Sequence, residues 1–136
     1  STSTAIGCAV ANPKQTTLIT GDLSFLYDSN ALWNNYIPSH FRIIVINNQG
    51  GGIFRILPGH KNTENFDRFF ETNHNLTAEH LCNMYGFEYS KAINESELTN
   101  NLQSFYSESN QPKLLEIFTP KDLNDEVLLQ YFKYLA

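Results

Sequence analysis

The feature that most constrains the fold is the apolar run at residues 41–46, with the sequence FRIIVI. A strand that is apolar at nearly every position is typical of the centre of a parallel sheet, because helices cover such a strand on both faces. A second run, TTLIT at residues 16–20, is β-branched and apolar as well. These runs predict an α/β fold, a parallel sheet with helices on both faces.

The rest of the chain alternates between helix and strand patterns. We predict helices at 1–11, 24–35, 53–57, 77–85, 94–106 and 125–135, and further strands at 87–89 and 113–118. Ser24, Thr77 and a capping box from Asn94 to Glu97 mark three helix starts. The helix at 24–35 is expected to bury Phe25, Leu26, Leu32 and Trp33. Residues 61–76 are hard to place and could form a loop with one helical turn.

Length and charge limit the classes of function. The 136 residues suit one domain, and the net charge of −5 argues against a nucleic-acid partner, which would require a basic patch. No apolar run approaches the about 20 residues of a membrane-spanning helix. Two cysteines without a CxxC pair, and no signal peptide, predict a cytoplasmic protein. A small-residue helix at the very start predicts an N-terminally truncated sheet, with residues 1–136 forming the single C-terminal domain of a longer protein.

Polar residues follow both apolar strands. Asp22 comes directly after the first strand, and Asn47 and Asn48 follow the second. The carboxyl ends of parallel strands lie together at the edge where ligands bind. Carboxylate, carboxamide and carbonyl oxygens are ligands that Mg²⁺ accepts, usually together with phosphate oxygens and water. The alternative is that Asp22 caps a helix and the asparagines form a turn.

A phosphate group would complete such a site. Backbone N–H groups at Leu23 and Ser24 are placed to bind it, and the glycine run 50–52 lets the backbone approach a ligand without Cβ clashes. A single carboxylate is a weak cation site, so the ligand itself should carry negative charge. The sequence therefore predicts a hard cation that holds a phosphate-bearing ligand.

These residues resemble the signature of thiamin-diphosphate enzymes, in which Gly-Asp-Gly is followed by a helix, a strand and Asn-Asn. Here the two blocks are 21–23 (GDL) and 47–48 (NN). The resemblance implies that Asp22, Asn48 and the carbonyl of Gly50 hold Mg²⁺, which binds the cofactor diphosphate. The cofactor-binding set it implies is Asp22, Leu23, Ser24, Asn48, Gly50, Gly51, Ile53 and Phe54.

Leu23 departs from the usual glycine. Together with NNQGGGIF at 47–54, it is similar to the branch of the family that acts in menaquinone (vitamin K2) biosynthesis. This implies a transferase, a carboligase that decarboxylates 2-oxoglutarate and adds the succinyl unit to isochorismate. Ile53, Phe54 and Leu57 would line the substrate wall, unless they simply belong to the core.

Part of the machinery is expected elsewhere. The glutamate that activates the cofactor in this family lies in another domain, usually of a partner subunit, so no catalytic residue is assigned in this chain. The resemblance also implies a homodimer or homotetramer, and a fragment that is inactive alone. Arg55 could reach a substrate anion or simply lie at the surface.

Two other functions stay open. One is a different thiamin-diphosphate enzyme, of the acetohydroxyacid synthase or 2-oxoacid decarboxylase type, in which glycine at position 23 would be more usual. The other is a non-catalytic Mg²⁺-binding α/β module such as a signalling receiver domain. That module would need an acidic cluster at the sheet edge, where only Asp22 is suitably placed.

Overall fold

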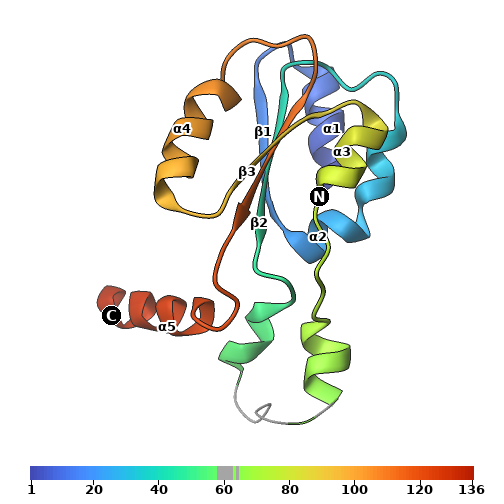
Figure 1. Cartoon of the computed structure of the whole chain (residues 1–136). Coiled ribbons are helices and arrows are strands. Elements are labelled where there is room, and N and C mark those ends of the chain that lie inside the picture. Colours follow the sequence, from blue (N-terminus) through green and yellow to red (C-terminus); the bar gives the residue numbers. More distant parts are fainter. Residues whose placement is uncertain (58–62, 64) are drawn as a thin grey trace. The chain divides into compact units, whose positions relative to one another are not determined.

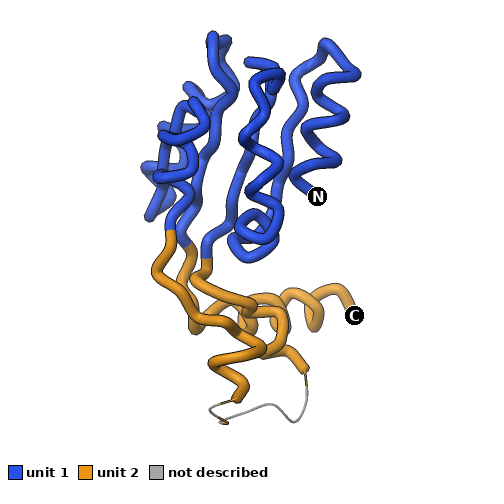
Figure 2. The backbone as a smooth tube through the Cα atoms, turned by 90° about the vertical axis from the view of Figure 1, so that its right-hand side faces the viewer, with its two compact units in different colours: residues 1–47, 77–118 blue, residues 48–76, 119–136 orange. Residues whose placement is uncertain are grey.

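The computed structural model describes residues 1–57, 63 and 65–136. These residues form two compact units (Figure 2). Unit 1 comprises residues 1–47 and 77–118, and unit 2 comprises residues 48–76 and 119–136. The chain therefore leaves unit 1 at the end of a strand, returns to it at residue 77, and leaves it again after residue 118.

Unit 1 is built on a four-stranded sheet (Figure 1). Its strands are β1 (Thr16–Gly21), β2 (Phe41–Asn47), β3 (Glu88–Ala92) and β4 (Lys113–Phe118), in the order β1-β2-β4-β3. All neighbouring pairs are parallel. The structure thus confirms the predicted parallel sheet, with β2 and β4 at its centre. β3 is longer than predicted, since it continues to Ala92.

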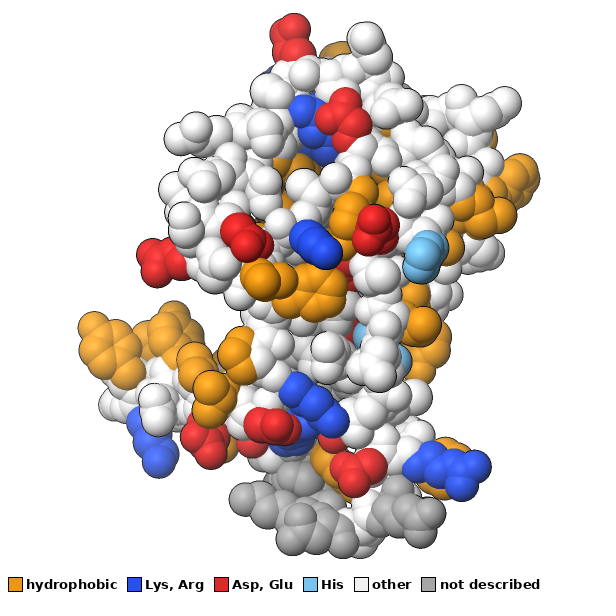
Figure 3. All heavy atoms as spheres, viewed as in Figure 1, with side chains coloured by type: hydrophobic (Ala, Val, Ile, Leu, Met, Phe, Trp, Pro, Cys, Tyr) orange, Lys and Arg blue, Asp and Glu red, His pale blue; other side chains and the backbone are white. Residues whose placement is uncertain are grey.

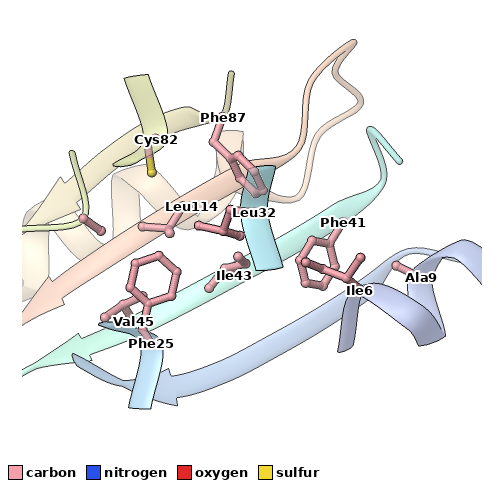
Figure 4. Packing of buried hydrophobic residues seen from close by; sticks show 11 residues of the cluster. Ile6, Ala9, Phe25, Leu32, Phe41, Ile43, Val45, Cys82, Phe87 and Leu114 are labelled. Carbon is pink, nitrogen blue, oxygen red and sulfur yellow. The ribbon is translucent and has the colours of Figure 1, made fainter. Parts of the chain in front are cut away.

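Helices cover both faces of this sheet, as predicted. Unit 1 contains α1 (Thr2–Ala11), α2 (Asp22–Tyr27), the 3₁₀ helix η1 (Ser29–Trp33), α3 (Glu79–Tyr85) and α4 (Glu95–Phe105). Successive side chains of a strand point to opposite faces, which divides the core into two clusters. On one face, α1, α2, η1 and α3 pack on the strands through Ile6, Phe25, Leu32, Phe41, Ile43, Val45, Cys82 and Leu114 (Figure 4). On the other face, Phe105 of α4 packs with Ile44, Ala92 and Leu115.

The predicted helix 24–35 is broken into two pieces. α2 begins at Asp22 and ends at Tyr27, and η1 follows it. Asp28 separates them, and its carboxylate accepts hydrogen bonds from the backbone N–H and hydroxyl of Ser3 in α1. The prediction of Ser24 as a cap is wrong because Ser24 lies inside α2. Phe25 and Leu32 are buried as predicted, but Trp33 is 69% exposed, so its predicted burial is wrong.

The other helix starts differ less. Asn94 caps α4 as predicted, since its Oδ1 accepts the backbone N–H of Glu97 at 2.9 Å. α3 begins at Glu79 rather than at Thr77, whose hydroxyl donates to a buried carboxylate on β4. Gly86 ends α3 with a φ of 74°, which is the left-handed conformation that favours glycine.

Two buried cations lie at the amino-terminal ends of the central strands. Arg42 and Lys113 are register partners on β2 and β4. Arg42 donates to the carbonyl oxygens of Phe105 and Ser107 at 2.7 Å each, and Lys113 donates to that of Ser104 at 2.7 Å. These carbonyls lie at the negative end of α4, which favours a cation. Burial lowers the pKa of Arg42.

Unit 2 contains the 3₁₀ helix η2 (Gly52–Ile56), the π-helix η3 (Phe66–Glu71) and α5 (Asn124–Leu135). η2 and α5 confirm the helices predicted at 53–57 and 125–135, and η3 is the helical turn predicted within 61–76. Part of that predicted loop, residues 61, 62 and 64, lies outside the described residues. Within the described part of the chain, no helix is both long and apolar enough to cross a membrane.

Candidate functional site

The carboxyl ends of three strands of unit 1 lie side by side. Gly21 of β1 pairs with Ile46 of β2, and Asn47 of β2 pairs with Phe118 of β4. Asp22 follows β1 directly as the first residue of α2, and its side chain is only 4% exposed. The structure thus confirms that Asp22 and the end of β2 border the same edge of the sheet.

The N–H groups predicted to bind phosphate lie at the start of α2. The backbone N–H of Leu23 donates to Oδ1 of Asp22 at 2.7 Å, so the carboxylate already engages this group. Ser24 is exposed within α2. The roles of Leu23 and Ser24 toward a phosphate stay predictions.

In unit 2, the loop after β2 packs against the last residue of η3 and the backbone that follows it. The N–H of Gly51 donates to the carbonyl of Glu71 at 2.6 Å, and the N–H of His74 donates to the carbonyl of Gln49 at 3.3 Å. Gly50 has a φ of 154°, and a Cβ there would lie 2.7 Å from the carbonyl oxygen of Glu71. Close backbone contact therefore explains the glycine at position 50, a reason that the sequence pattern did not reveal.

Asn48 folds back over the same loop. A Cβ at Gly52 would lie only 2.7 Å from Nδ2 of Asn48, so the glycine leaves room for the carboxamide. Gln49, which follows Asn48 in the chain, has a φ of 64°, which is uncommon for a residue other than glycine. The loop is therefore tightly constrained around the predicted ligand Asn48.

The predicted substrate wall lies on and beside η2. Ile53 is 68% exposed, Leu57 is exposed too, and Phe54 packs edge-on against Phe70 with ring centroids 5.7 Å apart. The alternative that Ile53 and Leu57 are core residues is therefore wrong within unit 2. Exposed apolar side chains are available for contact with a ligand or another surface, and their role as a substrate wall stays a prediction.

Arg55 is neither a simple surface residue nor an unpaired cation. Its side chain is 14% exposed and forms ion pairs with Glu71 and with Asp122, the latter at 3.2 Å between Nη1 and Oδ1. Nη1 also donates to the carbonyl of Lys121 at 2.5 Å. Arg55 thus joins η2, the end of η3 and the segment before α5. No sequence pattern indicated Glu71 as its partner, because Arg55 lies between Phe54 and Ile56 with no acidic residue within five positions.

Sequence reasoning also missed Glu116, a carboxylate on β4 that is only 1% exposed. It shares a face of β4 with Leu114, as the period of two along a strand requires. Its oxygens accept hydrogen bonds from side chains of Asn47, Thr77 and Tyr89. An acidic residue inside an otherwise buried strand is the signal that could have revealed it, because such a group needs donors. Burial, and then Glu116 itself, raise the pKa of Tyr89.

The predicted metal ligands form an all-oxygen set. One carboxylate from Asp22, one carboxamide oxygen from Asn48 and the carbonyl of Gly50 fit Mg²⁺ when phosphate and water complete its shell. Asp22 belongs to unit 1, and Asn48 and Gly50 belong to unit 2. Their joint coordination of Mg²⁺ stays a prediction. Among the described residues, no group of three or more His, Cys, Asp or Glu side chains could hold a metal ion.

Comparison with known proteins decides the family. Residues 1–117 match the family described as thiamine pyrophosphate enzyme, C-terminal TPP binding domain. The chain belongs to this family. Thiamine pyrophosphate is thiamin diphosphate, so the cofactor is the one that the GDL and NN blocks implied. Membership in this family rules out the receiver-domain alternative.

Several relatives are named "2-succinyl-5-enolpyruvyl-6-hydroxy-3-cyclohexene-1-carboxylate synthase". The protein from Christiangramia forsetii is 63% identical over 99% of this chain and 23% of its own length. Those from Flavobacterium psychrophilum and Porphyromonas gingivalis are 60% and 43% identical, over 100% and 99% of this chain and 24% and 23% of their own lengths. The chain therefore spans about a quarter of the length of these relatives.

Proposed function

We propose that this chain is the thiamin-diphosphate-binding domain of a carboligase of menaquinone biosynthesis. The enzyme decarboxylates 2-oxoglutarate and adds the resulting succinyl unit to isochorismate. The observation that carries the proposal is the 60–63% identity, over nearly the whole chain, to relatives named as the synthase above. Loss of CO₂ from the five-carbon 2-oxoglutarate leaves a four-carbon succinyl unit, and isochorismate has the enolpyruvyl and hydroxyl groups that the name of the product contains.

The cofactor site follows from the residues at the strand ends. Mg²⁺ is held by Asp22, by the carboxamide oxygen of Asn48 and by the carbonyl of Gly50. The N–H groups of Leu23 and Ser24 bind the diphosphate. Gly51 lines the cofactor site without a direct hydrogen bond, because its N–H donates to the carbonyl of Glu71. When bound, thiamin diphosphate supplies the electron sink for decarboxylation and carbon–carbon bond formation.

The apolar residues around η2 bind and shield the substrate. Ile53, Phe54 and Leu57 form the wall beside the cofactor ring and the substrate, where they exclude water from the reacting centre. The exposure of Ile53 and Leu57 and the packing of Phe54 on Phe70 support this assignment. Because the carboxylates of Glu71 and Asp122 already pair with Arg55, we assign no substrate anion to that arginine.

The rest of the enzyme completes the site. Residues 1–136 act as a single C-terminal domain of a longer cytoplasmic protein, which works as a homodimer or homotetramer. The glutamate that activates the cofactor, and the groups that bind the substrate carboxylates, come from other parts of that protein. The isolated chain is therefore inactive.

Calorimetric titration of the intact parent protein with thiamin diphosphate, with and without Mg²⁺, tests the site. We expect Mg²⁺-dependent binding that Asp22→Ala abolishes and that Asp67→Ala, which removes an exposed carboxylate of η3, leaves unchanged. The wild-type protein is then given 2-oxoglutarate and isochorismate, and the product is identified by mass spectrometry. Binding that is insensitive to Asp22→Ala would overturn the metal assignment, and absence of the expected product would overturn the reaction.

The same assay distinguishes the proposed reaction from that of another thiamin-diphosphate enzyme. An acetohydroxyacid synthase or a 2-oxoacid decarboxylase would consume pyruvate or another short 2-oxoacid in place of 2-oxoglutarate. Leu23 in the GDL block disfavours that reading. Pyruvate turnover without 2-oxoglutarate turnover would establish it instead.

A further inference from the structure

The segment 48–76 of unit 2 is joined to unit 1 at both of its ends. It leaves after Asn47, the last residue of β2, and returns at Thr77, just before α3. This segment contains the predicted metal ligands Asn48 and Gly50 and the predicted substrate wall. The conformation of its two border residues therefore restricts the directions in which the chain can leave β2 and enter α3.

One buried carboxylate holds both borders. Oε1 of Glu116 accepts the side-chain N–H of Asn47 at 2.7 Å, and Oε2 accepts the hydroxyl of Thr77 at 2.6 Å. The backbone N–H of Ala78 lies 3.2 and 3.1 Å from the two oxygens, and the hydroxyl of Tyr89 donates to Oε2 at 2.7 Å. Four donors from three elements thus meet at the carboxylate of Glu116.

We propose that Glu116 is a positioning residue for the cofactor site, which fixes the departure of segment 48–76 at Asn47 and its return at Thr77. The proposal rests on the proposed function, because it assigns Mg²⁺ binding to the residue that follows Asn47. Glu116 acts through Asn47 and Thr77 and does not itself contact the metal, cofactor or substrate.

The chemistry of the contact suits this role. Hydrogen bonds to a carboxylate are shorter and about twice as strong as those between neutral groups. All four donors to Glu116 are uncharged, so an apolar side chain in its place removes an acceptor from each of them. The hydroxyls of Thr77 and Tyr89 lie 3.2 Å apart and can also bond to each other. A glutamine can serve in part, because its oxygen can face Asn47 while its amide donates to the hydroxyls of Thr77 and Tyr89, which can also accept.

Three variants of the intact parent protein test the role. Glu116→Ala removes both anchors, and Glu116→Gln is the conservative variant expected to rescue. Lys113→Met is the matched control, because Lys113 is a buried, hydrogen-bonded charge at the other end of β4, bound to Ser104 and Ser107. Both Glu116→Ala and Lys113→Met should lower the melting temperature of the cofactor-free protein, so melting alone does not separate positioning from stability.

The Mg²⁺ concentration that gives half-maximal thiamin-diphosphate binding is the first measurement. Loss of a residue that hydrogen-bonds a metal ligand typically costs about 10–100-fold in metal affinity. Glu116 bonds Asn47, the residue next to the proposed ligand Asn48, so we expect a rise of about 10-fold for Glu116→Ala. Glu116→Gln should stay within about threefold of wild type, and Lys113→Met should not change. At saturating Mg²⁺ and cofactor, kcat of Glu116→Ala should recover to near the wild-type value.

Hydrogen exchange of the cofactor-free protein is the second measurement. Peptides covering residues 48–57 and 66–76 should exchange faster in Glu116→Ala than in the wild type. In Lys113→Met their exchange rates should be unchanged. If Glu116→Ala does not fold, Thr77→Val removes one anchor with little change of volume and should speed exchange at residues 66–76. Unchanged exchange and an unchanged Mg²⁺ requirement would overturn the proposal. Absence of Mg²⁺-dependent binding in the wild type would instead overturn the proposed function, while the exchange measurement still decides the role of Glu116.

Discussion

The two units of this chain differ in how their apolar residues are used. In unit 1, the central strands are buried on both faces, and residues such as Phe41, Ile43 and Leu114 have no exposed surface (Figure 4). In unit 2, α5 has no buried residue although it contains valine, leucine, tyrosine and phenylalanine. Figure 3 shows the hydrophobic side chains along α5 at the surface. The central strands of unit 1 bury their apolar residues, whereas α5 of unit 2 leaves its own exposed.

This difference separates stability from binding. Unit 1 supplies a fixed sheet edge and the carboxylate of Asp22, and unit 2 contains the glycine loop and the exposed Ile53. Binding residues are commonly carried by loops that a rigid scaffold supports. Substitutions of buried apolar residues in unit 1 should therefore act mainly on the free energy of unfolding, and substitutions of exposed apolar residues in unit 2 mainly on ligand binding.

The largest expected effect is the loss of a core aromatic ring in unit 1. Phe41→Ala should lower the free energy of unfolding by about 3–5 kcal/mol, because a buried phenyl ring leaves a cavity. Phe132→Ala in α5 makes the same change at an exposed position, and we expect about 0.5 kcal/mol or less. Native-state hydrogen exchange of β2 and α5 peptides in the intact parent measures both. Equal costs would show that α5 is buried in the whole enzyme, and the contrast between the units would fail.

The ion pair of Arg55 tests whether unit 2 has a stable part of its own. Arg55→Met leaves the buried carboxylate of Glu71 without its partner, which should cost about 3 kcal/mol locally. Arg68→Met is the matched control, because exposed Arg68 only stacks over Phe69, at 5.3 Å from the ring centroid. It should cost about 1 kcal/mol or less. Faster hydrogen exchange at residues 50–56 in Arg55→Met alone is the expected result. Similar exchange in both variants would show that the glycine loop is held by its backbone contacts.

The buried thiol of Cys82 in unit 1 should make the free energy of unfolding depend on pH. Burial raises the pKa of the Cys82 thiol from 9.0 to about 12, with Glu116 and Glu79 adding to the shift. Between these two pH values the folded state keeps a proton that the unfolded state loses. The stabilisation is therefore complete below pH 9 and is lost as the pH rises toward 12, by at most about 1.4 kcal/mol per pH unit.

Urea midpoints of wild type and Cys82→Ala between pH 8 and 10.5 measure this contribution, and the two curves should converge as the pH rises. Alkylation gives an independent check at pH 8. Cys8 is exposed on α1 and should react in the folded protein, whereas buried Cys82 should react only after unfolding. Parallel urea curves would show that Cys82 does not titrate differently in the two states.

The sequence predicts most of unit 1 because local patterns and burial agree there. Apolar runs specify β1, β2 and β4, and the capping box at Asn94 specifies the start of α4. The break at Asp28 could not be predicted in this way, since it depends on a hydrogen bond to Ser3, far away in the chain. The family signature indicated Asp22 and Asn48 as metal ligands because their spacing reflects neighbouring strand ends, and this assignment stays a prediction.

The contacts of Glu71 and Glu116 could not be predicted from sequence patterns. Glu71 lies in a polar segment without periodicity, and its pairing with Arg55 depends on how the chain folds back after η2. The donors to Glu116 come from β2, β3 and the start of α3, so no local window contains them. Such contacts join residues that are distant in sequence, and only the fold brings them together.

Ile53→Ala should change stability least among these variants, and it should change the kinetics of the enzyme. Ile53 in unit 2 and Ile93 in unit 1 are 68% and 64% exposed, so truncating either should change the free energy of unfolding by about 0.5 kcal/mol or less. If Ile53 contacts the substrate, its truncation should lower kcat/KM for 2-oxoglutarate or isochorismate by about 10-fold, the scale of a lost apolar contact in a binding pocket. Ile93→Ala should leave kcat/KM unchanged, because Ile93 follows β3 and has no predicted contact with the site.

Steady-state kinetics of the intact parent with each substrate varied in turn measures both variants. Equal kinetics for the two would remove Ile53 from the substrate wall and leave its exposure to be explained by another surface of the enzyme.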